Sequence, residues 1–230
     1  MRSIVFDTGP LISLTMTHLM WTLDHLKKRF DGNFYITEAV RKELIDRPLE
    51  INKFKFEALH SLRYLRKNVI EVYPKAEYEE LSHHLLELTN NIFSAHHKPI
   101  QIVHRGEIET LALAIRLKAQ AVAVDERTTL ELVESADRVK YLLSKKLHTK
   151  IHVNYTKLEE FKELTKDLRP IRSVGFAMAA YEMGLLDRYL PDGPFDRGIL
   201  LDAVLWSLKL NGCAITQTEI EELVKLEFSH

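Results

Sequence analysis

Four acidic residues have positions from which they could act together. Asp7 and Asp125 each follow a short apolar run typical of a strand buried on both faces. An acid that ends a strand lies at the carboxyl edge of a sheet, where open α/β folds bind ligands. Glu43 lies on a predicted amphipathic helix, and Glu107 lies at the start of a later one. We therefore ask whether these acids form one site.

A cluster of carboxylates favours a divalent cation. Negative charges placed so near one another repel strongly, so some of the acids would be protonated unless a cation were present. The candidate ligands are oxygens only, the chain has a single cysteine, Cys213, and neither His83-His84 nor His96-His97 has the i, i+4 spacing of a helical metal site. Such a ligand set favours Mg²⁺ or Mn²⁺ over zinc. These ions activate water and stabilise the charge that builds on a phosphate during in-line displacement.

Each acid also has a purely structural interpretation. Asp7, which precedes Gly9-Pro10, could be a turn former or a helix cap, and Asp125 has a similar alternative. Glu43 could be a solvated helix residue, and Glu107 could simply favour the helix dipole. The combination of all four acids is more specific than any single one.

Hydrophobic periodicity predicts the elements that position these acids. Strands are expected at 4–6, 34–36, 69–72, 121–124 and 151–153. Helices are expected at 11–29, where one amphipathic helix ends in three cations, at 38–45, where Pro48 stops the helix, and at 108–115, 128–133 and 139–147. Alternating elements of these lengths predict an α/β fold with a parallel sheet covered by helices on both faces.

Two segments differ from this pattern. Residues 50–100 read as two polar helices around the short strand at 69–72, inserted between the second and third acids. From residue 156 onward the chain reads as helical throughout, with a break at Pro170, a loop at 191–194 and a capping box at Thr216–Glu219. The insert could form a lid or a dimer surface.

Composition limits the classes of function. The chain has 32 Lys and Arg against 33 Asp and Glu, so any binding of nucleic acid must be local. One cysteine excludes an internal disulfide and a cysteine-rich zinc site. No apolar run approaches the length of a membrane span, and no secretion signal begins the chain, so a cytoplasmic location is the default expectation.

The pieces that carry these acids resemble the PIN domain, in particular the archaeal and bacterial group with a Gly-Glu-x-Glu motif. The matching pieces are Ile4–Thr8 with Pro10–Ile12, Ile36–Leu44, Gly106–Glu109 with Leu111–Ala114, and Ala121–Arg127. The resemblance covers about residues 1–50 and 100–150, and extends more loosely to Arg172–Gly175 and Ala180–Leu186.

The resemblance implies a PIN-like three-layer α/β/α sandwich with a central parallel sheet and a metal-dependent endoribonuclease activity. By motif, Asp7, Glu43, Glu107 and Asp125 would bind Mg²⁺ or Mn²⁺ and act in catalysis. The implied domains are a PIN-like nuclease domain at 1–155, with the insert at about 50–100, and a helical C-terminal extension at 156–230. Many relatives have Thr or Ser where this chain has Ala123, so a hydroxyl contact is absent there.

A nuclease also needs groups that hold the RNA backbone. Arg105 and Arg127 are the predicted phosphate contacts, and Thr8 and Ser13 could orient a metal-bound water or a phosphate, although capping is the simpler role for both hydroxyls. RNA is the expected partner. A homodimer is also expected, and an antitoxin-like or other protein partner is a further alternative. Whether Glu109 or Glu126 contributes stays open.

Three functions follow as hypotheses. The first is a metal-dependent ribonuclease, and the second is a non-catalytic PIN-like module that binds RNA or a protein through its insert and tail. The third, a phosphatase or phospho-acceptor, is weaker, because its usual nucleophile motif pairs two acids around one residue and Asp7-Thr8-Gly9 does not. A toxin role and a processing role remain alternatives within the first hypothesis.

Overall fold

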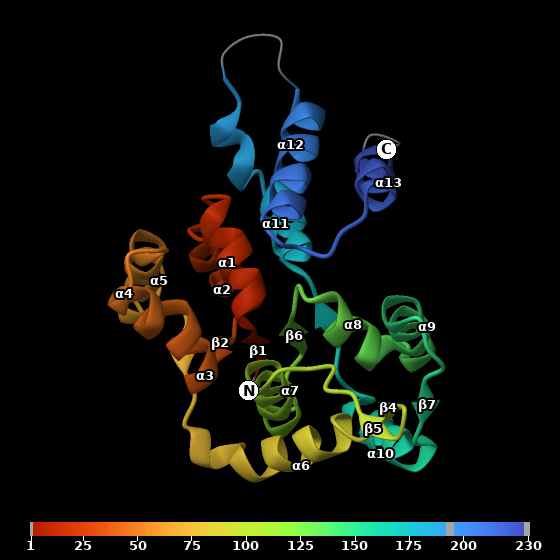
Figure 1. Cartoon of the computed structure of the whole chain (residues 1–230). Coiled ribbons are helices and arrows are strands. Elements are labelled where there is room, and N and C mark those ends of the chain that lie inside the picture. The colour runs from red at the N-terminus through yellow and green to blue at the C-terminus, as the bar shows by residue number, and fades with distance from the viewer. Residues whose placement is uncertain (1, 192–195, 228–230) are drawn as a thin grey trace.

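The central sheet of the protein has five parallel strands. The computed structural model describes residues 2–191 and 196–227, and the strand order is β3-β2-β1-β6-β8. The strands are β1 (Ser3–Phe6), β2 (Asn33–Ile36), β3 (Glu71–Val72), β6 (Ala121–Ala123) and β8 (Pro170–Ile171). Helices flank this sheet (Figure 1), which confirms the predicted α/β fold with a central parallel sheet.

Two hydrophobic cores cover the two faces of the sheet, and β1 is therefore buried on both sides. Ile4 and Phe6 belong to the first core and Val5 to the second. The first core includes α1 (Thr8–Met16), α2 (Thr22–Phe30), α11 (Ser173–Glu182), α12 (Arg197–Leu210) and α13 (Gln217–Glu227). The second includes α6 (Glu79–Thr89), α7 (Arg105–Leu117), α8 (Arg127–Glu134), α9 (Ala136–Leu147) and α10 (Tyr155–Thr165). In Figure 1 the first set lies above the sheet, and α6, α7 and α10 lie below it.

The insert contains the predicted helix, strand and helix. These are α5 (Lys55–Arg66), β3 and α6, and β3 extends the central sheet beside β2. Short 3₁₀ turns lie at η2 (Lys75–Glu77) and η3 (Leu185–Tyr189). A second, antiparallel sheet has the order β5-β4-β7, with β4 (Phe93–Ala95), β5 (Lys98–Pro99) and β7 (His152–Val153). The strand predicted at 151–153 thus exists but pairs outside the central sheet.

The single helix predicted at 11–29 is wrong, since the chain turns between α1 and α2. His18 has φ 58°, a left-handed conformation that ends a helix. The hydroxyl of Thr17 donates to the Ser13 carbonyl at 2.8 Å, and the N–H of Leu19 donates to the Leu14 carbonyl at 2.7 Å. These bonds satisfy the last carbonyls of α1 and let α2 start in a new direction.

The helix predicted at 38–45 does not end before Pro48. Thr37 caps α3 (Glu38–Arg41) as predicted, accepting from the Val40 N–H at 3.2 Å. The chain then forms a π-helical turn, η1 (Lys42–Asp46), and continues into α4 (Arg47–Glu50). Proline cannot donate to the preceding turn, and the wider π turn accommodates it.

The C-terminal segment differs from the all-helical prediction at one point. Pro170 and Ile171 form β8, an edge strand, where the missing N–H of proline carries no cost. The capping box is confirmed, because the Thr216 N–H donates to Glu219 Oε2 at 2.8 Å and the Glu219 N–H donates back to Thr216 Oγ1. Apart from Pro191, the loop predicted at 191–194 lies outside the described residues.

Helices α11, α12 and α13 share one core with α1 and α2. The proposed division at 155/156 stays a prediction. No helix in the described ranges has both the length and the apolar character of a membrane span.

Candidate functional site

Asp7 is the centre of the candidate site. It directly follows β1, its N–H donates to the Ala123 carbonyl of β6 at 2.9 Å, and its side chain is buried. Burial raises the pKa of Asp7 to about 7, and the carboxylates of Glu107 and Glu43 add to the rise, while the N–H groups of Thr8 and Gly9 oppose it. No lysine or arginine of the described ranges forms an ion pair with Asp7.

Glu43 reaches the site from the π turn η1. Its Oε2 accepts a hydrogen bond of 2.9 Å from the hydroxyl of Thr8, the first residue of α1. Its Oε1 lies so close to Gly106 of α7 that a Cβ there would be 3.3 Å away. The carboxylate of Glu43 is therefore held between the first turns of two helices, and π turns often occur at such sites.

Glu107 lies in the first turn of α7, where it contacts the backbone of its own helix and also lies near other carboxylates. The His104 N–H donates to its Oε2 at 2.8 Å, so Glu107 caps α7, a role that goes beyond the helix-dipole interaction considered from the sequence. Burial raises the pKa of Glu107, this hydrogen bond opposes the rise, and the nearby carboxylate of Glu126 adds to it. Glu107 thus caps its helix and also contributes negative charge beside Asp7.

Asp125 follows β6 and is almost completely buried. Its Oδ2 accepts a 2.6 Å hydrogen bond from the Ser13 hydroxyl, and its Oδ1 accepts a 2.7 Å bond from the Ser173 N–H. A Cβ at Gly9 would lie 3.3 Å from the Cβ of Asp125 and 3.9 Å from Oδ2 of Asp7. The two aspartates therefore flank Gly9, while both oxygens of Asp125 are engaged by α1 and α11.

The structure brings three of the four predicted acids into electrostatic contact and places the fourth beside them. The carboxylates of Glu107 and Glu43 both raise the pKa of Asp7, and Asp125 lies at the neighbouring strand end. Within residues 2–191 and 196–227, no three His, Cys, Asp or Glu side chains already converge as a metal-binding group. The oxygen-only donors and the raised pKa of Asp7 nevertheless match a hard divalent cation.

The four predicted substrate contacts have different surroundings. Thr8 and Ser13 donate to Glu43 and Asp125, so both hydroxyls orient carboxylates. Arg105 pairs with the buried Glu109 at 2.9 Å and keeps a largely exposed side chain beside Glu43.

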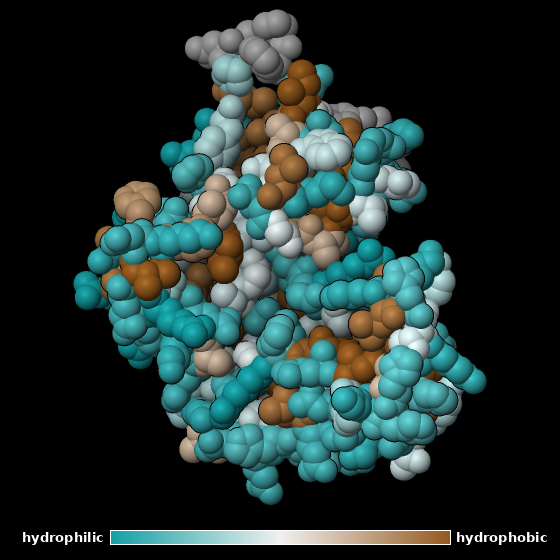
Figure 2. All heavy atoms as spheres, in the orientation of Figure 1, coloured by the Kyte–Doolittle hydropathy of each residue, from teal (hydrophilic) through white to brown (hydrophobic). Residues whose placement is uncertain are grey.

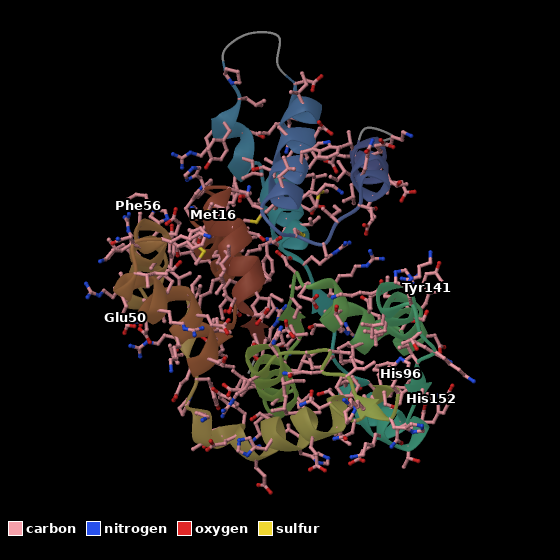
Figure 3. All side chains as sticks on the ribbon, viewed as in Figure 1. Met16, Glu50, Phe56, His96, Tyr141 and His152 are labelled. Carbon is pink, nitrogen blue, oxygen red and sulfur yellow. The ribbon has the colours of Figure 1, made fainter. Side chains whose placement is uncertain are left out.

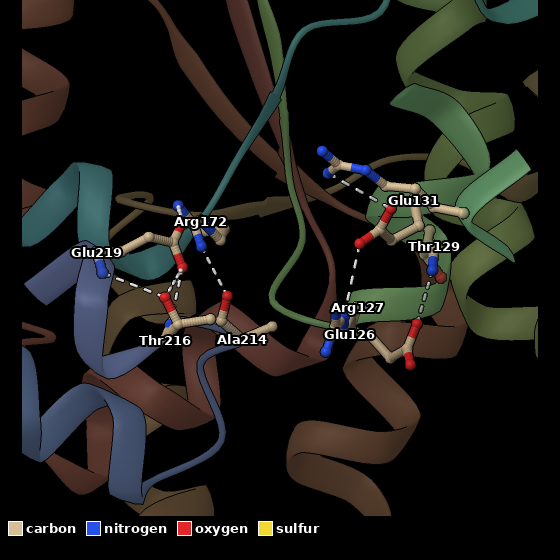
Figure 4. Close-up of polar contacts among 9 residues, drawn as sticks. Glu126, Arg127, Thr129, Glu131, Arg172, Ala214, Thr216 and Glu219 are labelled. Atoms are coloured by element: carbon tan, nitrogen blue, oxygen red, sulfur yellow. Dashed lines mark hydrogen bonds and ion pairs between the residues drawn. The ribbon is translucent and has the colours of Figure 1, made fainter. Parts of the chain in front are cut away.

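Arg127 pairs with Glu131 at 3.5 Å and faces another groove, of about 860 Å³, between α8 and the C-terminal helices. Figure 4 shows Arg127 opposite Arg172, which binds Glu219 and the Ala214 carbonyl. Glu126, whose role the sequence left open, caps α8 by accepting from the Thr129 N–H at 2.7 Å.

A polar groove of about 590 Å³ borders Glu43 and α7. Five cations line it, namely Arg41, Lys42, Arg47, Lys75 and Arg105. Lys42 and Arg47 have no ion-pair partner in the described part of the chain, so their charge is available to a phosphate.

Sequence reasoning missed Thr110 and the two close-approach glycines. Thr110 is fully buried, and its hydroxyl lies 3.5 Å from Oδ1 of Asp7. Its spacing of three residues from Glu107 places both on one face of α7, which was the available signal. Gly9 and Gly106 are needed because a larger residue would crowd the carboxylates.

The fold and the site define an α/β protein with acids gathered at the carboxyl edge of a parallel sheet. A family profile described as PIN domain matches residues 3–137, so the chain belongs to the PIN-domain family and has its nuclease-like fold. PIN domains are generally nucleases that typically use divalent metals. Comparisons with curated proteins and with solved structures gave no match.

Proposed function

We propose that this protein is a metal-dependent endoribonuclease whose site comprises Asp7, Glu43, Glu107 and Asp125. The observation that carries the proposal is the state of Asp7, a buried carboxyl whose pKa is raised to about 7 beside two further acids. A carboxyl in that setting gains most from a bound cation, since the cation offsets both the desolvation and the repulsion.

The residues divide the work by position. Asp7, Glu43 and Glu107 would hold Mg²⁺ or Mn²⁺, and Asp125 would join them through the lone pairs that Ser13 and Ser173 leave free. A bound divalent cation supplies an activated water and stabilises the charge that develops on the phosphate. Thr8 keeps Glu43 facing the site, because its hydroxyl donates to that carboxylate.

The chain also has groups for the RNA backbone. The groove beside Glu43 contains Lys42 and Arg47, whose positive charge suits phosphate oxygens, and Arg105 at its α7 side. Backbone phosphates are held in this way whatever the base sequence. Arg127 would contact the RNA only where the RNA extends beyond α8.

Calorimetric titration with Mn²⁺ and a cleavage assay on single-stranded RNA test this proposal together. We expect wild-type protein to bind Mn²⁺ and to cleave, and Asp7→Asn to lose both while keeping its far-UV circular dichroism. Asp202→Asn is the matched control, since Asp202 is exposed on α12, remote in sequence from the site. Full metal-dependent cleavage by Asp7→Asn would exclude the assigned site.

A second candidate function is a non-catalytic module that binds RNA or protein. Two observations favour it: no metal-binding group is already assembled in the described residues, and both oxygens of Asp125 accept protein hydrogen bonds. A titration that shows no heat at millimolar Mn²⁺, together with intact RNA after incubation, would select this function over the first.

A further inference from the structure

The segment 47–67, which comprises α4, the connection 51–54, α5 and Lys67, has a charge unlike that of the whole chain. It contains six Lys and Arg residues and two acids, although the chain as a whole has net charge −1. We call it the α4–α5 segment. Its six cations are Arg47, Lys53, Lys55, Arg63, Arg66 and Lys67.

These cations are exposed and available. All six side chains face solvent, and none forms an ion pair with a carboxylate of the described ranges. Lys53 lies over the ring of Phe54 at 4.7 Å. Elsewhere on the protein many cations are paired with acids, so this segment concentrates positive charge that the fold itself does not use.

Aromatic rings are interleaved with this charge. Phe56 is 73% exposed, and its ring stacks on His60 with centroids 6.2 Å apart and 21° between the planes. His60 in turn meets the ring of Tyr64 at 6.1 Å, one further turn along α5. Figure 3 shows Phe56 at the outer end of α5, and Figure 2 shows brown apolar spheres among teal ones on this side of the molecule.

A small recess lies between this surface and Glu43. It has a volume of about 120 Å³ and lies between α1, η1 and α5. Phe54, Ser61 and Glu43 are among the residues that line it. Ser61 is 1% exposed and its hydroxyl has no hydrogen-bond partner in the described structure, so a polar ligand atom could satisfy it. The recess is smaller than the cavity of about 150 Å³ that holds a benzene ring, so it has room for no more than a single six-membered ring, as in a pyrimidine.

From these observations we infer that the α4–α5 segment binds single-stranded RNA and inserts one base beside Glu43. The inference rests on the proposed function and names the surface that presents the strand to it. Glu43 lines both the recess and the polar groove of about 590 Å³. A base in the recess would therefore place its neighbouring phosphate in that groove. Bases are free to stack on exposed rings only in single strands.

The same surface fits an anionic strand better than an apolar protein partner. Along α5 the exposed apolar side chain of Leu59 lies between the exposed cations Lys55 and Arg63, which stand one helical turn to either side of it. Six cations against two acids match a phosphate backbone. Aromatic rings that stack on bases, combined with cations that bind phosphates, are typical of proteins that bind single strands without sequence specificity.

Binding is measured without cleavage, using the full chain in EDTA and fluorescence anisotropy of a labelled oligouridylate of about 12 nucleotides. We expect Phe56→Ala to weaken binding roughly fivefold or more, because one stacked base is no longer held. The double variant Lys55→Ser with Arg63→Ser should weaken binding and reduce the salt dependence, by about 0.7 in log–log slope for each phosphate that the protein no longer neutralises.

Helix α9 offers a matched control. Tyr141 is 56% exposed and Lys145 lies 4.6 Å from its ring centroid, the same chemistry as Phe54 with Lys53. Figure 3 places Tyr141 on the opposite side of the molecule from Phe56. Tyr141→Ala and Lys145→Ser should leave the affinity unchanged.

The outcomes separate this inference from the proposed function. Strand binding that depends on the α4–α5 segment, in a protein that cleaves nothing, supports the inference and rejects the nuclease. Cleavage with unchanged affinity in the α4–α5 variants rejects the inference alone. Equal affinity of the protein for duplex and single-stranded RNA overturns the inference. The inference is also overturned if the α4–α5 variants change self-association, measured by light scattering, and leave RNA binding unchanged.

Discussion

The hydroxyl of Thr8 donates a hydrogen bond of 2.9 Å to Oε2 of Glu43. This contact joins the start of α1 to the π turn η1, two parts of the chain 35 residues apart. Thr8 adjoins Asp7, so the same turn positions one acid by its backbone and a second acid by its side chain. Glu43 is otherwise an exposed residue. Its orientation therefore depends on this contact.

Thr8→Val should impair metal binding and cleavage far more than folding. Valine keeps the shape but cannot donate, and outer-shell partners of metal ligands typically contribute about 10- to 100-fold in affinity or activity. Mn²⁺ titration and cleavage rates measure the loss. Thr17→Val is the control, because the Thr17 hydroxyl bonds only to carbonyls of its own helix. Equal activity of Thr8→Val and wild type would show that Glu43 needs no such support.

Gly106→Ala should separate stability from activity. In a helix, alanine is favoured over glycine by about 0.5–1 kcal/mol, yet here the new Cβ would lie 3.3 Å from Oε1 of Glu43. We expect thermal stability to be maintained or increased while Mn²⁺ affinity falls. Gly175→Ala in α11 meets nothing within 4 Å and should give the stability gain alone. A drop in metal affinity for both variants would argue against a specific crowding of Glu43.

Asp7 should make the metal-free protein less stable as the pH rises. Its pKa is raised from 3.8 to about 7 by burial and by Glu107 and Glu43, so between these values the folded state holds a proton that the unfolded state has released. The free energy of unfolding therefore falls across this window. Above pH 7, Asp7→Asn should be more stable than wild type by about 2–4 kcal/mol, and the difference should vanish near pH 4.

Urea unfolding in EDTA at several pH values tests that prediction. Mn²⁺ added at pH 8 should then stabilise wild-type protein and leave Asp7→Asn unchanged, since ligand binding to the native state raises the free energy of unfolding. A parallel pH profile for the two proteins would mean that Asp7 titrates normally.

Arg172 should anchor the last helix to the sheet. It donates to the Ala214 carbonyl at 2.6 Å and to Glu219 at 2.8 Å, at the start of α13. Burial alone would raise the pKa of Glu219, but hydrogen bonds from Arg172 and Thr216 lower it to about 2. Arg172→Ala should cost about 1–3 kcal/mol at neutral pH.

A double-mutant cycle with Glu219→Gln measures the pair itself by urea unfolding. Glu219 has a lowered pKa, so its contribution is present above its ordinary pKa and is lost as the pH falls towards 2. Additive losses in the two single variants at pH 7 would show that the pair is not coupled.

The main elements were predictable because buried strands and helices have a recognisable local pattern of apolar residues. Ile4, Val5 and Phe6 are apolar on both faces, as expected for a central parallel strand, and the sheet confirms it. The break at His18 and the passage of the helix through Pro48 were not predictable. Both depend on hydrogen bonds and packing that override the local preference. Of the two-residue strands, β3 and β7 lie within predicted strands, whereas β5 and β8 carry too little pattern to detect.

For the site, the sequence by itself determined which acids lie at strand ends and helix starts, because residue type and periodicity are local properties. Only the tertiary structure decided how they are held: Thr8 beside Glu43, Ser13 and the Ser173 N–H on Asp125, and Glu107 shared between its cap and the cluster. These contacts join residues up to 112 positions apart. Side-chain orientation of that kind follows from the packing of whole elements, which no local pattern contains.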